Sequence, residues 1–266
     1  MQAFHAEFRR AMLSDVPLVN LVAKYIIRTK GKQVRPMLVL LAAQASGNVN
    51  PATYRAATFV ELLHTATLVH DDVIDEAETR RGFASIKALW RNKVGVLMGD
   101  YLLAQGLLLS VKSSDYHFLE ITSNAVRRMS EGELYQLQKA RQLNTVESDY
   151  FRIIADKSAS LLSTCCELGA ASAFPNPTTL TGPADAATLA QATAYRAALA
   201  AYGEAVGIAF QIRDDLFDYL SAESTIGKPV AIDLKEKKMT LPLIHALGKA
   251  SQSERKRIVG LVRSGK

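Results

Sequence analysis

Two acidic clusters, each set within an apolar stretch, are the residues of this sequence best suited to carry chemistry. Both have the pattern Asp-Asp-x-x-Asp, at residues 71–75 and 214–218. Carboxylates in apolar surroundings must be paired or bind a metal, because a lone buried charge is very costly. Oxygen ligands favour hard cations such as Mg²⁺, which shares its coordination shell with waters and substrate phosphates. The clusters therefore predict a metal–diphosphate site, and its candidate metal ligands are Asp71, Asp72, Asp75, Asp214, Asp215 and Asp218.

Helical spacing orients both clusters. Residues four apart share a helix face, so Asp71 and Asp75 point the same way. His64, seven residues before Asp71, lies on the same ridge, whereas Asp72 is rotated aside. Gln211 extends the second acidic face by one turn. One such cluster alone is compatible with an exposed acidic helix surface, but two copies in apolar helices favour metal binding.

Basic residues after the first cluster and near the start of the chain suit phosphate. Arg80 and Arg81 follow the first cluster, and guanidinium groups bind phosphate oxygens with paired hydrogen bonds. Lys32 and Arg35 precede an apolar helix that has Pro36 in its first turn. A helix N-terminus with two cations forms an anion site. The alternative is a basic loop without a ligand.

Two further lysines have more than one interpretation. Lys157 is flanked by apolar turns, so it is either a lysine at the edge of the core with its amine in solvent or a phosphate ligand. Lys228 stands in a Gly-Lys-Pro turn of a basic loop that follows the second cluster.

The elements that must position these residues are helices. The chain has 266 residues, of which 48% are apolar and 22% charged, so it can bury a sizeable core. Apolar residues recur at helical spacing, and no stretch alternates convincingly as a strand. The sequence predicts an all-α fold of about ten helices in a single domain spanning residues 1–266. Breaks between helices are expected at residues 46–53, 113–115, 142–149 and 172–188.

Charge, cysteines and hydropathy argue against other classes of protein. The net charge is +6, but the basic residues are scattered, so we expect no nucleic-acid binding. Cys165 and Cys166 are neighbours that rarely bridge, which indicates reduced thiols and a cytoplasmic protein. Residues 94–111 form the most apolar run, but Asp100 and Gln105 interrupt it. We therefore expect a buried helix there, and no integral membrane protein.

The order of these motifs resembles the trans-isoprenyl diphosphate synthase family, also called polyprenyl synthetases. The segments that match the family's motifs, in the family's order, are GKQVRP, ELLHTATLVHDDVIDEAETRRG, MGDYLLA, GELYQLQ, DKSASLL, GIAFQIRDDLFDYL and GKPVAIDLKEKKMTLPL. The resemblance implies a helical bundle around a deep central cavity and a homodimer. It also implies a Mg²⁺-dependent transferase that condenses isopentenyl diphosphate head to tail with an allylic diphosphate.

The resemblance further implies a role for each matching residue. Asp71, Asp75 and Asp214 would bind Mg²⁺, with three ions bridging the allylic diphosphate. The carboxylates that would hold metal-bound waters or orient the other ligands are Asp72, Asp215 and Asp218. The residues that would contact the allylic diphosphate are Arg80, Lys157, Gln211 and Lys228. Those that would hold isopentenyl diphosphate are Lys32, Arg35, His64 and Arg81. The catalytic residues near the allylic cation would be Lys157, Ser158 and Gln211; Ser158 replaces the family's usual threonine and keeps its hydroxyl.

Product length in this family depends on residues before the first aspartate. Bulky aromatic residues four or five positions before it form the floor of a short pocket. Here those positions are Thr67 and Ala66, with Leu63 one turn deeper, and none is aromatic. The resemblance therefore implies an open pocket and a product longer than fifteen carbons.

Two alternatives share part of the pattern. A class I terpene cyclase shares the fold and the first acidic motif, but its second motif is usually of an Asn/Ser/Glu type and it lacks GKQVRP. A non-catalytic or regulatory subunit of a heteromeric prenyl synthase tends to lose one acidic cluster. This sequence keeps both clusters, which favours the catalytic interpretation.

Overall fold

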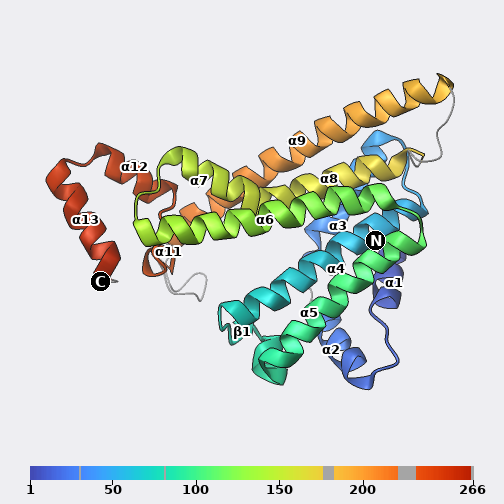
Figure 1. Cartoon of the computed structure of the whole chain (residues 1–266), viewed down its shortest axis with the longest axis horizontal. Helices are drawn as coiled ribbons and strands as arrows, with labels where there is room; N and C mark the ends of the chain where they lie inside the picture. The colour runs from blue at the N-terminus through green and yellow to red at the C-terminus, as the bar shows by residue number, and fades with distance from the viewer. Residues whose placement is uncertain (30, 81, 176–182, 221–231, 265–266) are drawn as a thin grey trace. The chain divides into compact units, whose positions relative to one another are not determined.

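The computed structural model describes residues 1–29, 31–80, 82–175, 183–220 and 232–264. Helices make up nearly all of the described elements (Figure 1), which confirms the predicted all-α class. In chain order the elements are α1 (Gln2–Ala11), α2 (Pro17–Arg28), α3 (Val34–Ser46), α4 (Pro51–Ile74), β1 (Thr79–Arg80), β2 (Phe83–Ala84), α5 (Ile86–Lys112), α6 (Tyr116–Gln142), α7 (Glu147–Ile154), the π-helical turn η1 (Ala155–Ala159), α8 (Ser160–Ala173), α9 (Pro183–Leu220), α11 (Ile232–Lys235), α12 (Leu241–Lys249) and α13 (Gln252–Ser264).

The predicted breaks between helices are confirmed, and local capping explains the first of them. Helix α3 ends before Gly47, whose φ of +151° is a conformation that favours glycine. Helix α4 begins at Pro51, and the Asn50 side chain accepts hydrogen bonds from the N–H groups of Ala52 and Thr53. The breaks after α5, α6 and α8 also fall within the predicted segments.

The chain divides into two compact units, which are described separately. Unit 1 comprises residues 1–122 and 164–200, and unit 2 comprises residues 123–163 and 201–266. Helices α6, α8 and α9 each contribute one segment to each unit. The single domain spanning the whole chain stays a prediction.

In unit 1, α4 and α5 pack along one another, and α1 and α3 pack against α4. The close approach of α4 and α5 depends on small residues: a side chain at Gly106 would lie 2.7 Å from the Phe59 ring, and one at Gly99 would lie 2.2 Å from the His70 ring. Cys165 and Cys166 are buried and free, as predicted, and burial raises the pKa of both thiols, that of Cys166 to about 11.

Helix α5 has one buried and one exposed apolar face. Within the described chain it is the helix whose length and composition would allow it to span a membrane, although only 33% of its most apolar window is buried. The expectation of a buried helix therefore holds for one face only. Beyond a kink at Arg91, where φ is +68°, the exposed apolar residues of α5 are Val96, Leu97, Leu107, Leu108 and Val111.

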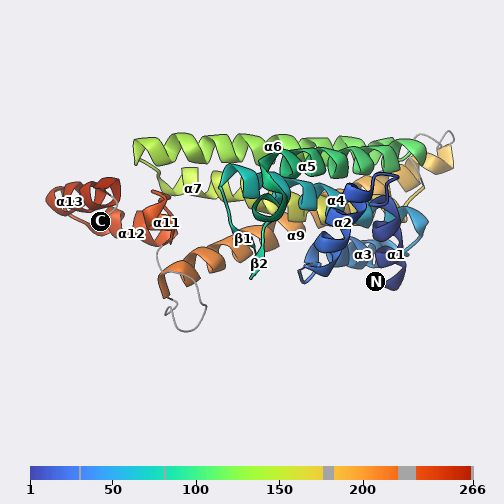
Figure 2. The same ribbon diagram turned by 90° about the horizontal axis from the view of Figure 1, so that it is seen from below.

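In unit 2, the C-terminal helices form a small apolar core of their own. Its buried members are Leu143, Met239, Leu243 and Leu247. Helix α13 covers this core with Ile258, Val259 and Val262, and Figure 2 shows α12 and α13 side by side. This core anchors residues 233–240, which contribute to the site described next.

Candidate functional site

The first acidic cluster lies at the C-terminal end of α4 in unit 1. The helix ends because Glu76 adopts a left-handed conformation with φ of +50°, and the Ala77 N–H donates to the Asp72 carbonyl over 3.0 Å. This is a Schellman-type ending, with glutamate where glycine is usual. Asp71 and Asp75 are exposed, and the Asp75 N–H donates to the Asp71 carbonyl over 2.8 Å. The two carboxylates that the sequence placed on one face are therefore both open to solvent.

Asp72 points away from that face, as the spacing predicted. Its side chain is only 4% exposed, and its Oδ1 accepts a hydrogen bond from Arg80 Nε over 2.6 Å. Arg80 lies on β1, where it pairs with Phe83 in a two-stranded hairpin that the sequence pattern did not indicate. The structure therefore brings together two of the predicted site residues as a partly buried ion pair.

The hairpin is tied to its surroundings by side-chain hydrogen bonds. The Tyr25 hydroxyl of α2 donates to the Ala84 carbonyl over 2.7 Å, and the Ser85 hydroxyl donates to the Ala77 carbonyl over 2.6 Å. These bonds hold the strand that carries Arg80. Arg81, predicted to bind the second diphosphate, lies outside the described residues.

Three of the four residues predicted to hold isopentenyl diphosphate line one groove in unit 1. Lys32, Arg35 and His64 face this groove together with Glu61, and its volume is about 350 Å³. Gln33 adopts a left-handed conformation, with φ of 52°, just before α3 begins. Lys32 is exposed and His64 is buried. The turn and the helix N-terminus thus place these residues at one groove, and anion binding there stays a prediction.

The residues predicted to limit product length lie on α4. Leu63 and Ala66 are buried, and the Thr67 hydroxyl donates to the His64 carbonyl over 2.9 Å. Phe59, also buried, is the first phenylalanine before them on this helix. Their role in product length stays a prediction.

The second acidic cluster lies near the end of α9 in unit 2. Asp215 is buried and accepts hydrogen bonds from the Tyr150 hydroxyl over 2.7 Å and from Gln211 Nε2 over 2.8 Å. Burial raises the pKa of Asp215, and the negative charges of Asp214 and Asp218 add to the rise. Asp214 is exposed and Asp218 is half-buried. The four residues predicted for one face therefore differ in exposure, and Asp215 is the one buried among them.

A pocket of about 110 Å³ in unit 2 brings four predicted residues together: Lys157, Ser158, Gln211 and Asp215. The pocket is also lined by residues that the sequence analysis missed as site residues, among them Tyr150, Asp233 and Lys238. Asp233 and Lys238 lie within a motif quoted for the family resemblance, which was the available signal, whereas nothing in the sequence singled out Tyr150. Burial, together with the charges of Asp215 and Asp218, raises the pKa of Asp233 to about 6.

Lys157 and Ser158 lie in the π-helical turn η1 between α7 and α8. The Lys157 amine is 2.5 Å from the Glu133 carboxylate of α6, and its side chain is about one third exposed. Lys157 is therefore an ion-paired residue at the pocket edge. Lys228 lies outside the described residues.

The carboxylates of both clusters suit a hard cation by their donor chemistry, since all offer oxygen alone. Three of the predicted ligands belong to unit 1 and three to unit 2. Within the described residues, no group of three or more His, Cys, Asp or Glu side chains could hold a metal ion. Each cluster by itself therefore supplies only some of the ligands that a metal ion needs. This suits an ion that keeps waters and binds phosphate oxygens.

Comparison with known proteins shows which family this chain resembles in sequence and fold. The family model "Polyprenyl synthetase" matches residues 16–266. The octaprenyl diphosphate synthase of Haemophilus influenzae is 36% identical over 255 residues, which cover 95% of this chain and 73% of that protein. The crystal structure of a decaprenyl diphosphate synthase from Rhodobacter capsulatus has a TM-score of 0.85 at 38% identity, covering 100% of this chain and 77% of the other. A polyprenyl synthase from Caulobacter crescentus, complexed with calcium and isoprenyl diphosphate, has a TM-score of 0.78 at 32% identity, covering 100% and 81%.

Proposed function

Because the chain belongs to the polyprenyl synthetase family and is a prenyltransferase, we propose that it condenses isopentenyl diphosphate with an allylic diphosphate in a Mg²⁺-dependent reaction. The observation that carries this proposal is the groove lined by Lys32, Arg35 and His64. An enzyme that elongates a prenyl chain needs a second diphosphate site, whereas a terpene cyclase does not. Two cations at a helix N-terminus suit that second diphosphate.

Mg²⁺ fits the donor chemistry of the acidic clusters. From the family resemblance we infer that Asp71, Asp75 and Asp214 hold the metal and that three ions bind with the diphosphate. The carboxylates that support them are Asp72, Asp215 and Asp218. When bound, the metal would stabilise negative charge on the departing diphosphate. The Caulobacter crescentus enzyme, complexed with calcium and isoprenyl diphosphate, supports a divalent cation in this family.

The chain's own residues then have distinct tasks. Lys32, Arg35 and His64 bind the diphosphate of isopentenyl diphosphate, with Arg81. The cations that bind the allylic diphosphate are Arg80, Lys157 and Lys228. These charges would stabilise the anion that develops as the C–O bond breaks and its electron pair leaves with the diphosphate.

Carbon–carbon bond formation follows at the allylic carbon. The double bond of isopentenyl diphosphate supplies the electron pair for the new bond, and the departed diphosphate accepts the proton that is lost. The Gln211 amide oxygen and the Ser158 hydroxyl face the allylic cation. The reaction requires a site that excludes water, because water would quench the cation.

We further propose a product longer than fifteen carbons. Leu63, Ala66 and Thr67 offer no aromatic side chain near the first acidic cluster. The octaprenyl and decaprenyl synthases to which the chain is similar support the same range.

We also propose a homodimer in the cytoplasm. The exposed face of α5 carries Val96, Leu97 and Leu108, and a second copy would cover it. Asp100, whose side chain is 63% exposed, lies on the same face. A carboxylate there would be costly against lipid, so α5 suits a protein partner better than a membrane.

Incubation of the purified chain with radiolabelled isopentenyl diphosphate and an allylic diphosphate tests the proposed function. We expect elongated prenyl diphosphates only when Mg²⁺ is present. Cyclised hydrocarbon formed without isopentenyl diphosphate would instead identify a terpene cyclase. Activity that appears only after a second, different chain is added would identify a regulatory subunit.

A further inference from the structure

The π-helical turn η1 presents two of the proposed active-site residues. In this turn the Ser160 N–H donates to the Ala155 carbonyl, five residues earlier, instead of following the α-helical pattern. Lys157 and Ser158 lie within the turn, and both line the pocket of unit 2. A π-helical turn is less favourable than a regular α-helical one and is frequent at functional sites. Its surroundings must therefore hold it in place.

Two glycines on neighbouring helices pack directly against the turn. A side chain at Gly132 of α6 would lie 2.7 Å from the Lys157 backbone nitrogen and 2.9 Å from Asp156 Cβ. A side chain at Gly207 of α9 would lie 2.5 Å from Ala159 Cα. The backbone of η1 therefore has helix backbone directly against it at both of these points.

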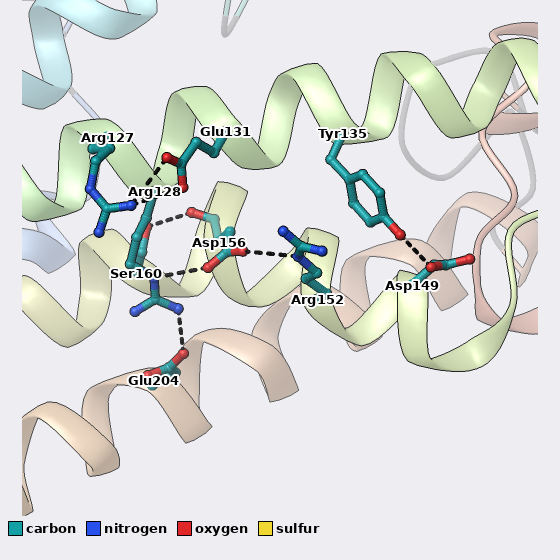
Figure 3. Close-up of polar contacts among 9 residues, drawn as sticks. All are labelled: Arg127, Arg128, Glu131, Tyr135, Asp149, Arg152, Asp156, Ser160 and Glu204. Carbon is teal, nitrogen blue, oxygen red and sulfur yellow. Dashed lines mark hydrogen bonds and ion pairs between the residues drawn. The ribbon is translucent and has the colours of Figure 1, made fainter.

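A cluster of charged side chains also forms hydrogen bonds with the same turn. Arg128 Nε donates to Asp156 Oδ1 over 2.8 Å, and Arg128 Nη2 donates to Glu204 Oε1 over 2.7 Å (Figure 3). The Ser160 hydroxyl donates to the Asp156 carbonyl over 2.6 Å. Burial lowers the pKa of Arg128, but its hydrogen bonds to Glu204 and Asp156 outweigh that effect and raise it.

The side chains of this cluster are not among those that line the pocket, so they act on it through the backbone. Asp156 directly precedes Lys157, and one planar guanidinium holds Asp156 to Glu204 on α9. On the basis of the proposed prenyl transfer, we propose that Arg128, Asp156 and Glu204 form a positioning triad. The triad sets the π-helical turn so that Lys157 and Ser158 face the allylic diphosphate.

The neighbouring pair Arg127–Glu131 is a matched control. Like the triad it pairs an α6 arginine with a carboxylate, and its closest nitrogen–oxygen distance is 3.0 Å. Its side chains are 60% and 55% exposed, and Figure 3 shows it beside the triad. Exposed pairs of this kind contribute little to stability, so Arg127→Met measures the effect of removing an arginine from α6 without disturbing η1.

Steady-state kinetics with Mg²⁺ tests the proposal. We expect Arg128→Met and Asp156→Asn to lower kcat/KM for the allylic diphosphate about tenfold to a hundredfold, because a small displacement of reacting groups is costly. The KM for isopentenyl diphosphate should stay unchanged. Arg127→Met should behave like the unsubstituted protein, and Arg128→Lys should restore only part of the activity, since an ammonium does not hold two carboxylates in one plane.

Amide hydrogen exchange of residues 155–159 separates this proposal from the proposed function. Faster exchange in Arg128→Met but not in Arg127→Met supports positioning, even if the unsubstituted protein makes no prenyl product, an outcome that would refute the proposed function alone. Folded Arg128→Met protein with unchanged kinetics and unchanged exchange would overturn the triad. So would a loss of activity that only parallels a lower melting temperature and is equal in Arg128→Lys and Arg128→Met.

Discussion

At the scale of single residues, Asp72 shows that a carboxylate of an acidic motif can orient a neighbouring arginine, here Arg80, instead of binding a metal directly. Asp72 is buried with its Oδ1 2.6 Å from Arg80 Nε, whereas Asp71 and Asp75 are exposed. A buried carboxylate that is already paired with a guanidinium is a poor first ligand for a metal. Its hydrogen bond instead fixes the direction of Arg80, which we propose binds the allylic diphosphate.

Substitution of the two neighbouring aspartates should separate these roles. Asp72→Asn should raise the KM for the allylic diphosphate about tenfold, because Arg80 loses a charge-assisted hydrogen bond. The Mg²⁺ concentration for half-maximal activity should change little. Asp71→Asn should show the reverse, with a strongly raised Mg²⁺ requirement. Metal titrations of both variants check this, and equal shifts in the Mg²⁺ requirement would show that Asp72 is itself a metal ligand.

Asp149 offers a prediction about pH. Burial would raise its pKa, but the Lys139 amine, 2.8 Å away, the Tyr135 hydroxyl and the Val146 N–H together lower it to about 2 (Figure 3 shows the Tyr135 contact). A carboxyl with a lowered pKa in the folded state stabilises the protein above its unfolded pKa, and this contribution is lost as pH falls through the folded pKa.

Asp149→Asn should therefore lower the free energy of unfolding by about 1 kcal/mol at neutral pH. The difference from the unsubstituted protein should disappear as pH falls from about 4 to about 2. Urea denaturation over this range measures it. Glu147→Gln, at an exposed site in the same helical turn, serves as the control. A difference of the same size at every pH would mean that charge is not the cause.

At the scale of elements, α4 combines three tasks along one helix. Its last turn carries the first acidic cluster, His64 contributes to the cationic groove, and Leu63 and Ala66 form part of the buried core. Because a helix rises about 1.5 Å per residue, Ala66 lies roughly 7 Å along the axis from Asp71. A growing prenyl chain that passes this position would need more room than an aromatic side chain leaves.

Ala66→Phe should shorten the product. The larger side chain would block the path about one isoprene unit beyond the acidic cluster, and overpacking would cost about 1 to 3 kcal/mol of stability. Product chromatography of the folded variant measures the chain length, which does not depend on how much of the protein is folded. Ala246→Phe, at an exposed position of α12, is the matched control. An unchanged product distribution in Ala66→Phe would refute the open-pocket hypothesis.

At the scale of the whole molecule, the exposed apolar face of α5 is the surface that we propose forms the dimer interface. Val96 and Leu107 lie three helical turns apart on this face, and Leu97, Leu108 and Val111 adjoin them. An apolar stripe of this length is costly in water. A two-fold dimer would bury the same stripe on both copies.

The double substitution Leu97→Glu with Leu108→Glu should yield monomers, because it places two unpaired charges in the proposed interface. Sedimentation velocity measures the change. Leu261→Glu, also at an exposed leucine but on α13, should leave the dimer intact. An unsubstituted chain that is monomeric, or that floats with phosphatidylcholine vesicles, would contradict the proposed homodimer.

The sequence alone determined the helical class, the four predicted breaks between helices and the two acidic clusters. Each depends on neighbours within a few turns: periodic burial, capping residues, or side chains on one helix face. Lys32, Arg35 and His64 could be grouped because the family motifs predicted them together, and the structure confirms that they line one groove.

Only the tertiary structure decided which carboxylates are buried and what they contact. The Asp72–Arg80 pair requires a hairpin, the Tyr150–Asp215 bond joins residues far apart in the chain, and the π-helical turn is held by Gly132 and other residues of neighbouring helices. Such contacts depend on the packing of entire helices, and helical periodicity contains no information about which helices meet.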